Sequence, residues 1–272
     1  MITSTANAKI KRIIQMQKKR KARDEEGLFQ VEGIRMFREI PPRDLQEIYV
    51  SQSFWEKEES LVREMADRAC IRPELVSDSV FEHLSATRTP QGILCLVRQK
   101  HYRPEDLTGE GTPFVMVLDR LQDPGNVGTI LRTAEGAGVT GVMLDAECAD
   151  IYNPKTIRST MGSIFRMPFC YVEDLEEGIR KLKERGVCVY AAHLEGKQSY
   201  DEADYRGPCA FLIGNEGNGL RPQIARMADT YIRIPMAGQV ESLNAAIAAT
   251  VLMFETGRQR RQGEKAACSR PV

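Results

Sequence analysis

The chain has 272 residues, of which 42% are hydrophobic, and its 38 Lys and Arg residues balance its 38 Asp and Glu residues. This length suits two ordinary domains, and the hydrophobic share suits a folded core. The longest largely apolar run, residues 245–254, is about half of the ~20 residues that a membrane span needs, and the N-terminus has no apolar signal segment. We therefore expect a cytoplasmic protein with no membrane partner.

Residue types that bind metals are scattered. Seven cysteines form no CxxC pair, and the three histidines have no partner at ligand spacing. Several cysteines lie in apolar, strand-like runs, where a reduced thiol acts as a small hydrophobic group. We therefore expect neither a metal site nor disulfides.

Positive charge is concentrated at the N-terminus. Residues 1–23 hold eight Lys and Arg residues and no acidic residue. The spacing of Ile10, Ile13 and Ile14 predicts one helix over residues 4–21, with an apolar face and a cationic face. A solvated basic helix and a phosphate-binding helix both fit this pattern. The candidate RNA contacts are Lys9, Lys11, Arg12, Lys18, Lys19, Arg20 and Lys21.

Short strand and helix patterns then alternate up to residue 100. Strands are expected at 27–33, 47–51 and 92–97, and helices at 34–40, 54–70 and 78–84. These elements predict a small α/β/α domain over residues 1–100. The charged segment 101–113 contains Pro and Gly and lacks periodicity, so it is expected to be a linker.

A second domain is expected over residues 114–257. Apolar strand patterns at 114–119, 141–145, 169–172, 187–194, 209–214 and 231–236 alternate with helical patterns, including 153–165, 174–185, 222–228 and a closing helix from about 245. Such alternation predicts an α/β fold with a mainly parallel sheet and helices on both faces. The basic stretch 258–272 is a candidate disordered tail, to which we assign no role.

The first polar stretch in this domain follows the strand that ends at Asp119. Asp123 begins a turn with Pro and Gly, and Asn126 is expected to cap a helix that reaches Arg132. The stretch contains neither the GxGxxG motif of dinucleotide-binding folds nor the GxxxxGK[ST] motif of phosphate loops. It therefore lacks the sequence evidence for an ordinary nucleotide-binding site. An ordinary turn with a surface arginine remains an alternative to a functional site.

The second stretch, residues 214–219, reads GNEGNG. Gly214, Gly217 and Gly219 permit positive φ and a close backbone approach, so that exposed backbone groups could contact a small ligand. Glu216 either binds neighbouring loop amides or contacts substrate, and we favour the structural role.

The third stretch, residues 234–244, reads IPMAGQVESLN. Ile234, Met236 and Leu243 offer apolar contact to a flat ring, and Ser242 and Asn244 present polar groups before the closing helix. Ser242 is also a plausible helix cap. No His or Lys stands beside it to activate it as a nucleophile, which argues against hydrolase chemistry.

Together and in this order, NxGxxxR, IGNEGxGL and IPMxGxxxSLN resemble the three signature motifs of the SpoU (TrmH-type) RNA 2′-O-ribose methyltransferases of the SPOUT superfamily. The resemblance covers residues 114–257. The segment GLFQVEGIRMFRE, after the basic helix, is similar to the L30e-like substrate-binding domain often joined to this family. One departure is SLNAAIA, where many members read SLNVSVA.

This resemblance implies a C-terminal trefoil knot that holds S-adenosylmethionine, and a homodimer that methylates RNA. It assigns Leu212, Ile213, Gly214, Gly217, Ile234, Met236 and Leu243 to cofactor binding. It places Asn126, Arg132, Ser242 and Asn244 near the shared active site as catalytic candidates. In mechanisms proposed for this family, the arginine that matches Arg132 acts as the base, but a guanidinium is hard to deprotonate. We expect Arg132 to bind phosphate and stabilise alkoxide charge.

The function expected on this basis is S-adenosylmethionine-dependent methylation of a ribose 2′-hydroxyl in ribosomal RNA, with 23S rRNA first and transfer RNA second. A non-catalytic RNA-binding or ribosome-assembly protein that keeps the fold is the alternative. Binding alone does not need Asn126, Arg132, Ser242 and Asn244 together, so their joint presence counts against this alternative. The sequence does not identify the nucleotide, or whether the substrate is naked RNA or an assembling subunit.

Overall fold

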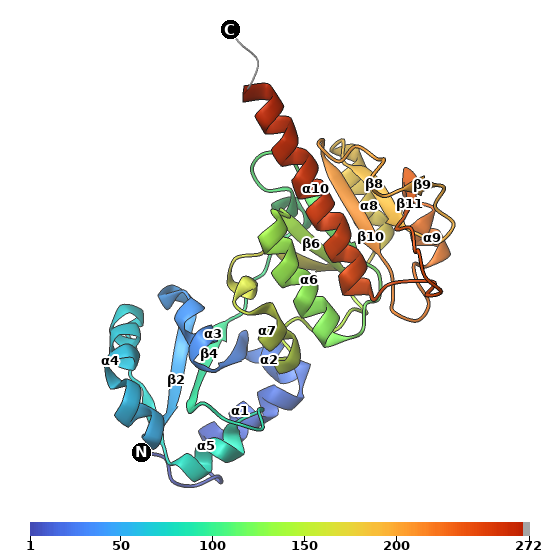
Figure 1. The fold of residues 1–272 in the computed structure, drawn as a ribbon. Helices are drawn as coiled ribbons and strands as arrows, with labels where there is room; N and C mark the ends of the chain where they lie inside the picture. The colour runs from blue at the N-terminus through green and yellow to red at the C-terminus, as the bar shows by residue number, and fades with distance from the viewer. Residues whose placement is uncertain (269–272) are drawn as a thin grey trace. The chain divides into compact units, whose positions relative to one another are not determined.

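The computed structural model describes residues 1–268, with side chains described to residue 263, and the chain forms two compact units. The first comprises Met1–Lys100 and Asp150–Phe165, and the second comprises His101–Ala149 and the chain from Arg166 onward. Each unit has its own sheet (Figure 1).

The sheet of the first unit has the strand order β1-β4-β2-β3. Strands β1 (Leu28–Glu32) and β2 (Leu45–Ser51) both pair antiparallel with β4 (Ile93–Arg98). The short strand β3 (Glu74–Val76), which sequence patterns did not predict, pairs parallel with β2.

Helices cover both faces of this sheet. Helices α1 (Ala8–Lys18) and α5 (Asp78–Leu84) bury Ile10, Ile13 and Phe81 against Tyr49 and Leu94. Helix α4 (Gln52–Ala69) lies on the other side of β2, and α3 (Ile34–Glu39) packs on β1 and β4 (Figure 1). The observed bounds agree with the predicted helices 34–40, 54–70 and 78–84 to within two residues.

The single opening helix predicted over residues 4–21 is wrong. The chain forms two helices, α1 and α2 (Arg20–Glu26), because Lys19 between them has extended backbone angles. The guanidinium of Arg23 donates to the carbonyls of Met16 and Gln17 and so satisfies the end of α1. Arg23 is almost fully buried, a position that hydrophobic spacing does not reveal.

Residues 150–165 interrupt the second unit and pack with the first. They form α7 (Pro154–Thr160) and the short 3-10 turn η3 (Ser163–Phe165), where the sequence pattern predicted one helix of the second domain. The rings of Tyr152 and Phe29 lie 4.7 Å apart between centroids, and Asp150 forms an ion pair with Arg23. The Tyr152 hydroxyl also accepts from the amide of Lys100 at 2.7 Å.

The second unit contains a seven-stranded sheet with the order β7-β6-β5-β10-β8-β11-β9, and every recorded pairing is parallel. The strands are β5 (Phe114–Leu118), β6 (Gly141–Asp145), β7 (Phe169–Val172), β8 (Cys188–Ala192), β9 (Gln198–Ser199), β10 (Cys209–Ile213) and β11 (Thr230–Arg233). The predicted mainly parallel α/β sheet is therefore confirmed, and β9 is an addition.

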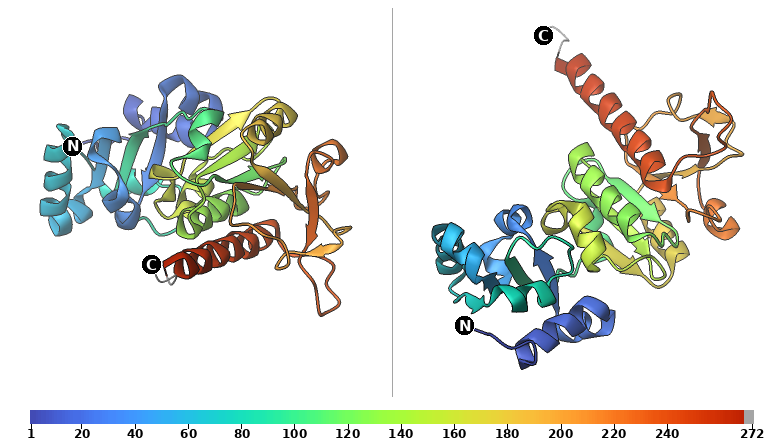
Figure 2. Two further views of the ribbon diagram at one scale, coloured as in Figure 1. Left: turned by 90° about the horizontal axis from the view of Figure 1, so that it is seen from above. Right: turned by 60° about the horizontal axis from the view of Figure 1, so that its bottom comes forward.

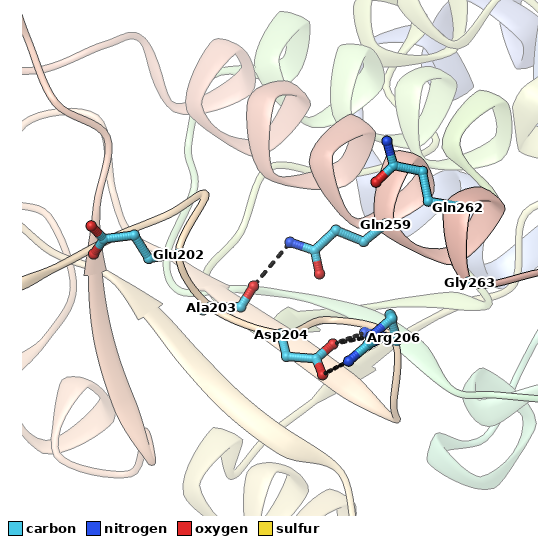
Figure 3. Close-up of a pocket in the computed structure, with 7 residues that line it drawn as sticks. All are labelled: Glu202, Ala203, Asp204, Arg206, Gln259, Gln262 and Gly263. Carbon is cyan, nitrogen blue, oxygen red and sulfur yellow. Dashed lines mark hydrogen bonds and ion pairs between the residues drawn. The ribbon is translucent and has the colours of Figure 1, made fainter. Parts of the chain in front are cut away.

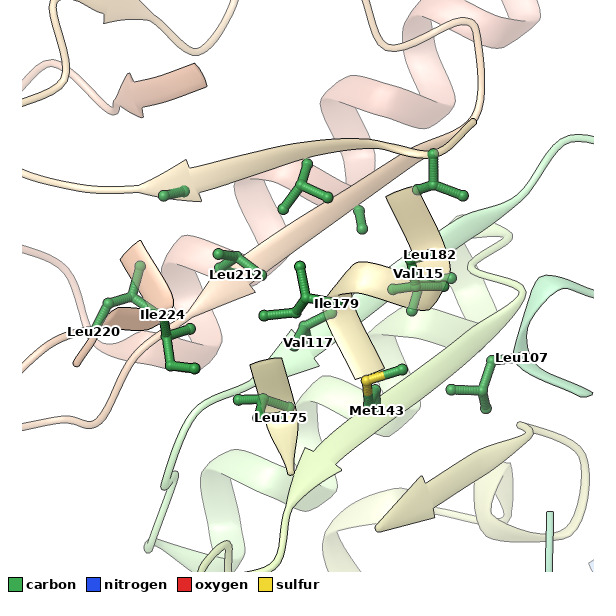
Figure 4. Close-up of a cluster of buried hydrophobic side chains, with 14 of the residues drawn as sticks. Leu107, Val115, Val117, Met143, Leu175, Ile179, Leu182, Leu212, Leu220 and Ile224 are labelled. Atoms are coloured by element: carbon green, nitrogen blue, oxygen red, sulfur yellow. The ribbon is translucent and has the colours of Figure 1, made fainter. Parts of the chain in front are cut away.

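Two layers of helices cover this sheet. Helix α8 (Leu175–Glu184) and helix α9 (Pro222–Ala225) pack on one face, where Val117, Ile179 and Leu212 are buried in one apolar cluster (Figure 4). Helix α6 (Pro124–Ala137) and the closing helix α10 (Ala245–Cys268) run side by side (Figures 1 and 2). A fully buried Leu or Ile side chain contributes roughly 2 kcal/mol, so these faces hold the sheet together.

Two segments are more ordered than their composition predicts. The expected linker 101–113 contains the 3-10 helix η2 (Pro104–Thr108), whose Leu107 is buried in the same cluster. Helix α10 continues through residues 258–268 of the expected tail, and residues 269–272 lie outside the described residues. In the described part of the chain, no helix is both long and apolar enough to span a membrane.

Candidate active site at the carboxyl edge of the sheet

Parallel pairing brings the loops after β5, β8, β10 and β11 to one edge of the sheet. Strand β10 lies between β5 and β8, with Ile213 aligned with Leu118. The chain thus reverses direction across the sheet at β5, and such switch points bind ligands in open α/β folds. All three polar stretches singled out in the sequence leave the sheet here.

The turn after β5 is built around Asp123. Its carboxylate accepts from the amide of Asn126 at 2.9 Å, so Asp123 is the residue that caps α6. The prediction that Asn126 caps this helix is wrong. Pro124 suits the first helical position, which makes the residue before it, Asp123, the cap. The Asn126 side chain is thereby free to contact other loops.

Glu216, in the loop after β10, binds the turn after β5. Its carboxylate accepts from the amides of Gln122 at 3.3 Å and Asp123 at 3.0 Å, and from Nδ2 of Asn126 at 2.9 Å. Burial raises the pKa of Glu216, but the hydrogen bonds from Asn126 and the backbone amides outweigh it and hold the pKa below its ordinary value. An ionised carboxylate therefore joins the two loops.

Asn244 connects the third loop to this cluster. Its Oδ1 accepts from the amide of Ala246 at 2.9 Å, so Asn244 caps α10. Its Nδ2 donates to Oδ1 of Asn126 at 3.1 Å. The alternative that Ser242 is the cap is wrong, and in the described part of the chain the exposed Ser242 makes no recorded hydrogen bond. Glu216, Asn126 and Asn244 thus form one chain of contacts across three loops.

The loop between β10 and α9 folds back on itself at two glycines. A side chain on Gly214 would lie 2.2 Å from the backbone of Gly219 and Leu220, so only glycine fits there. Gly219 has a φ of +67° and pairs with Asn215. Gly217 has neither a positive φ nor a close neighbour, so the sequence argument applies to two of the three glycines.

Arg221 anchors the end of this loop and was missed by motif reading. Its Nε donates to Asp119 at 2.7 Å and its NH2 group to Asp145 at 2.6 Å. Both carboxylates are buried at the ends of β5 and β6. The signal was available, because an aspartate at the end of a continuous apolar strand needs a cationic partner.

Arg132 lies apart from the cluster. It is exposed on α6, six residues after Asn126, which places it about 9 Å along the axis and about 240° around it. Within the described residues, no hydrogen bond or ion pair is recorded between Arg132 or Ser242 and Asn126, Asn244 or Glu216. One chain therefore brings together two of the four catalytic candidates.

The candidate cofactor residues fall into two groups. Leu212 and Ile213 are buried at the end of β10, and the Leu212 side chain belongs to the apolar core, so it offers only backbone atoms to a ligand. Ile234, Met236 and Leu243 are half-buried in the loop before α10. No hydrogen bond of residues 234–243 is recorded in the described structure. Backbone N–H and C=O groups beside these apolar side chains are therefore available to a ligand. This combination suits a ligand with an aromatic ring and polar edges.

One cavity lies away from this edge. A cavity of about 350 Å³ is lined by Glu202, Ala203, Asp204, Arg206, Gln259, Gln262 and Gly263 (Figure 3). Asp204 pairs with Arg206, and Gln259 donates to the carbonyl of Ala203 at 2.9 Å. These polar groups bind one another and none is a candidate site residue, so the candidate active site remains the carboxyl edge. Among the described residues no group of three His, Cys, Asp or Glu could hold a metal ion.

The candidate RNA contacts of the first unit differ in whether their charge is paired with an acidic side chain. Lys9 pairs with Glu74 at 2.5 Å, and Arg12 binds both Glu26 and Glu47. Arg20 and Lys21 face Asp24 and Glu25 one turn later. In the described chain no acidic partner is recorded for the exposed Lys11, Lys18 and Lys19. Much of the positive charge that the first 23 residues carry is therefore balanced locally.

Comparison with family models gives two matches that together cover most of the chain. Residues 113–254 match the SpoU rRNA Methylase family, and residues 7–95 match the MRM3-like substrate binding domain.

Individual relatives match over nearly their whole length. The chain is 32% identical to a 23S rRNA (guanosine-2′-O)-methyltransferase of Bacillus subtilis, over 93% of this chain and 97% of that protein. It is 31% identical to an uncharacterized tRNA/rRNA methyltransferase of Synechocystis, over 95% and 94%.

Solved structures agree. An AdoMet-bound rRNA methyltransferase from Sinorhizobium meliloti superposes with a TM-score of 0.84 at 32% identity, covering 94% of this chain and 97% of that one. A SpoU methyltransferase from Streptomyces viridochromogenes in complex with AdoMet gives a TM-score of 0.82 at 26% identity, covering 94% and 98%.

Proposed function

Because the chain belongs to the SpoU rRNA methylase family, we propose that it transfers a methyl group from S-adenosylmethionine to a ribose 2′-hydroxyl of ribosomal RNA. The observation that carries the proposal is the joining of three motif loops at one edge through Glu216, Asn126 and Asn244. The full-length similarity to an enzyme named as a 23S rRNA 2′-O-methyltransferase supports 23S rRNA as the substrate. Transfer RNA is the second candidate.

The residues of the carboxyl edge fit this cofactor. Ile234, Met236 and Leu243 supply half-buried apolar contacts for an adenine ring, and the unpaired backbone groups around them supply polar ones. Gly214 keeps the neighbouring loop tight enough to form the opposite wall. Two of the similar solved structures contain AdoMet, which supports the assignment. When bound, the sulfonium supplies an already activated methyl group.

The protein must then align the 2′-oxygen with the methyl carbon and assist loss of the hydroxyl proton. We assign to Arg132 the binding of the adjacent phosphate and the stabilisation of the developing alkoxide. Its guanidinium stays protonated, so it acts as a donor and not as the base. Asn126 and Asn244, which bind each other, and Ser242 orient the reacting groups.

A homodimer is a further part of this proposal. Ile247 and Phe254 are about half exposed on α10, and the half-buried Val251 lies between them at helical spacing. A soluble protein rarely leaves such a stripe uncovered unless a partner binds it. Pairing through α6 and α10 of two copies would also bring the Arg132 of one subunit toward the loops of the other, which explains its isolation within one chain.

The decisive experiment maps 2′-O-methyl nucleotides by mass spectrometry in ribosomal and transfer RNA from cells with and without the gene. Loss of one methyl group on deletion, restored by the wild-type gene and not by Arg132→Ala, is the expected result. Rescue with Arg180→Lys, a conservative change on the surface of α8, serves as the control. If every methyl group survives the deletion, the protein binds RNA without methylating it or acts on another RNA.

A further inference from the structure

The first unit carries exposed arginines that the basic N-terminal helices do not include. Arg35 and Arg38 lie on α3, and Arg88 lies in the loop between α5 and β4. All three are exposed, and within residues 1–268 none has a recorded hydrogen bond or ion pair. They contrast with Arg12 and Lys9, whose charges are paired with carboxylates.

Hydrogen bonds bring the two segments together. At the end of β1, Glu32 accepts from the amide of Ala86 at 3.1 Å and from the hydroxyl of Thr87 at 2.8 Å, and it also binds Ser85. At the start of α3, the amide of Ile34 donates to the side chain of Gln91 at 2.8 Å. The loop 85–91 is therefore fastened at both ends to the chain just before Arg35.

A glycine makes this attachment close. Gly33 has a φ of +96°, and a side chain there would lie 2.9 Å from Oε1 of Gln91. On the other side of Arg35, Met36 and Phe37 are buried and fix the direction of α3. Arg35 and Arg38, three residues apart on one helix, share a face. The three guanidinium groups are thus presented by a rigid support at one end of the sheet.

We propose that Arg35, Arg38 and Arg88, the arginine surface, bind an unpaired segment of the RNA substrate. This proposal rests on the proposed function and adds to it the recognition element. All three residues are arginine, whose planar fork binds phosphate through two hydrogen bonds and stacks on exposed bases. Proteins recognise RNA sequence mainly in loops and bulges, where bases and phosphates are splayed apart. Lysines give phosphate attraction without that geometry.

The test compares two triple variants of the full-length protein. One is Arg35→Gln, Arg38→Gln, Arg88→Gln. The matched control is Lys11→Gln, Lys18→Gln, Lys19→Gln, which removes from α1 and its end three charges with no recorded acidic partner in the described chain. Binding is measured across a salt series to a protein-free 23S rRNA transcript and to a fully paired RNA duplex. Thermal unfolding checks that both variants stay folded, as expected for exposed side chains with no recorded partner among the described residues.

The arginine variant should bind the 23S transcript at least tenfold more weakly, and its log–log salt slope should flatten by about 2, since each phosphate contact on single strands contributes about 0.7. Its affinity for the duplex should change less than threefold. The lysine variant should bind both RNAs more weakly, by similar factors. A third variant, Arg35→Lys, Arg38→Lys, Arg88→Lys, should keep the salt slope and still lose several-fold in affinity for the transcript. Unchanged binding by the arginine variant, or an equal loss on both RNAs, overturns the proposal.

Methyl transfer from labelled S-adenosylmethionine separates this inference from the proposed function. Wild-type transfer together with unaltered binding by the arginine variant refutes the arginine surface and leaves the enzyme standing. A wild-type protein that transfers no methyl group, with binding lost in the variant, refutes the enzyme and leaves the surface standing. A wild-type protein that binds neither RNA refutes both.

Discussion

At the scale of single residues, the site depends on one carboxylate that no catalytic proposal invokes. Glu216 binds two backbone amides and Asn126, so it orders the turn that carries the start of α6. Asn126 then supports Asn244 on the third loop. A change at Glu216 should therefore disturb both loops, although it removes only one charge.

We expect Glu216→Gln to lower the free energy of unfolding by about 1 kcal/mol at pH 7, because an amide cannot replace a carboxylate at every donor. The pKa of Glu216 is lower in the folded protein than its ordinary value of 4.5, so its contribution is present above about pH 4.5 and is lost as the pH falls through the folded pKa. Urea unfolding of the wild type and variant should therefore converge in acid. Asn218→Ala, in the same loop, is the control, and a difference that persists unchanged to pH 3 would contradict the assignment.

Arg132 offers a second prediction at this scale. If its fork binds phosphate and stabilises alkoxide charge, Arg132→Ala should lower kcat by about a hundredfold, the usual effect of losing one donor to a developing oxyanion. Arg132→Lys keeps the charge and should still lose at least tenfold. Binding of S-adenosylmethionine, measured by calorimetry, should not change in either variant. Near-normal turnover of Arg132→Lys would make the bidentate geometry unnecessary.

At the scale of elements, α10 is held to the sheet by its own C-terminal half. Arg260 donates to the carbonyls of Thr112 at 3.1 Å, Pro113 at 3.0 Å and Gly207 at 2.9 Å, and its guanidinium lies 5.1 Å from the centre of the Phe114 ring. These contacts close the end of the sheet opposite the candidate active site. They also explain why the chain stays helical where its composition suggested a tail.

We expect Arg260→Met to lower the free energy of unfolding by roughly 2 kcal/mol, because these carbonyls, and that of Tyr205 at 3.3 Å, lose a charged donor. Arg261→Met is the matched control, since Arg261 is exposed and has no hydrogen bond recorded in the described chain. Urea unfolding followed by circular dichroism measures both. Equal midpoints for the two variants would show that the extension of α10 does not stabilise the unit.

At the scale of the whole molecule, two units with separate cores share one chain that crosses between them more than once. Residues 150–165 leave the second unit after β6 and pack on β1 of the first. The family match and the parallel sheet confirm the expected fold class. The trefoil knot that the resemblance predicts is consistent with the solved relatives.

The proposed homodimer gives a prediction at this scale. Replacing Ile247 and Phe254 with Asp should convert the protein to a monomer in light scattering, because two charges cannot be buried without partners. Methyl transfer should fall with the dimer fraction if Arg132 acts on the partner's loops. Leu194→Asp, at an exposed apolar residue outside α10, should leave the mass unchanged. A double variant that stays dimeric would rule out this interface.

The sequence by itself determined the elements and the family. Apolar runs and helical spacing predicted most strand and helix positions, because the order of apolar and polar residues follows which faces of an element are buried. The three loop motifs predicted the candidate site, where a close backbone approach requires glycine at 214 and a positive φ favours it at 219.

Only the tertiary structure decided which side chains cap the helices and which form ion pairs. Asp123 and not Asn126 caps α6, Asn244 and not Ser242 caps α10, and Arg221 binds Asp119 and Asp145 across about 100 and 76 positions of sequence. Residues 150–165 join the first unit through Arg23 and Phe29. Each of these contacts joins residues that are far apart in the chain or chooses between neighbouring polar side chains. Spacing along the chain does not encode such choices, because they depend on which groups the fold brings within hydrogen-bond distance.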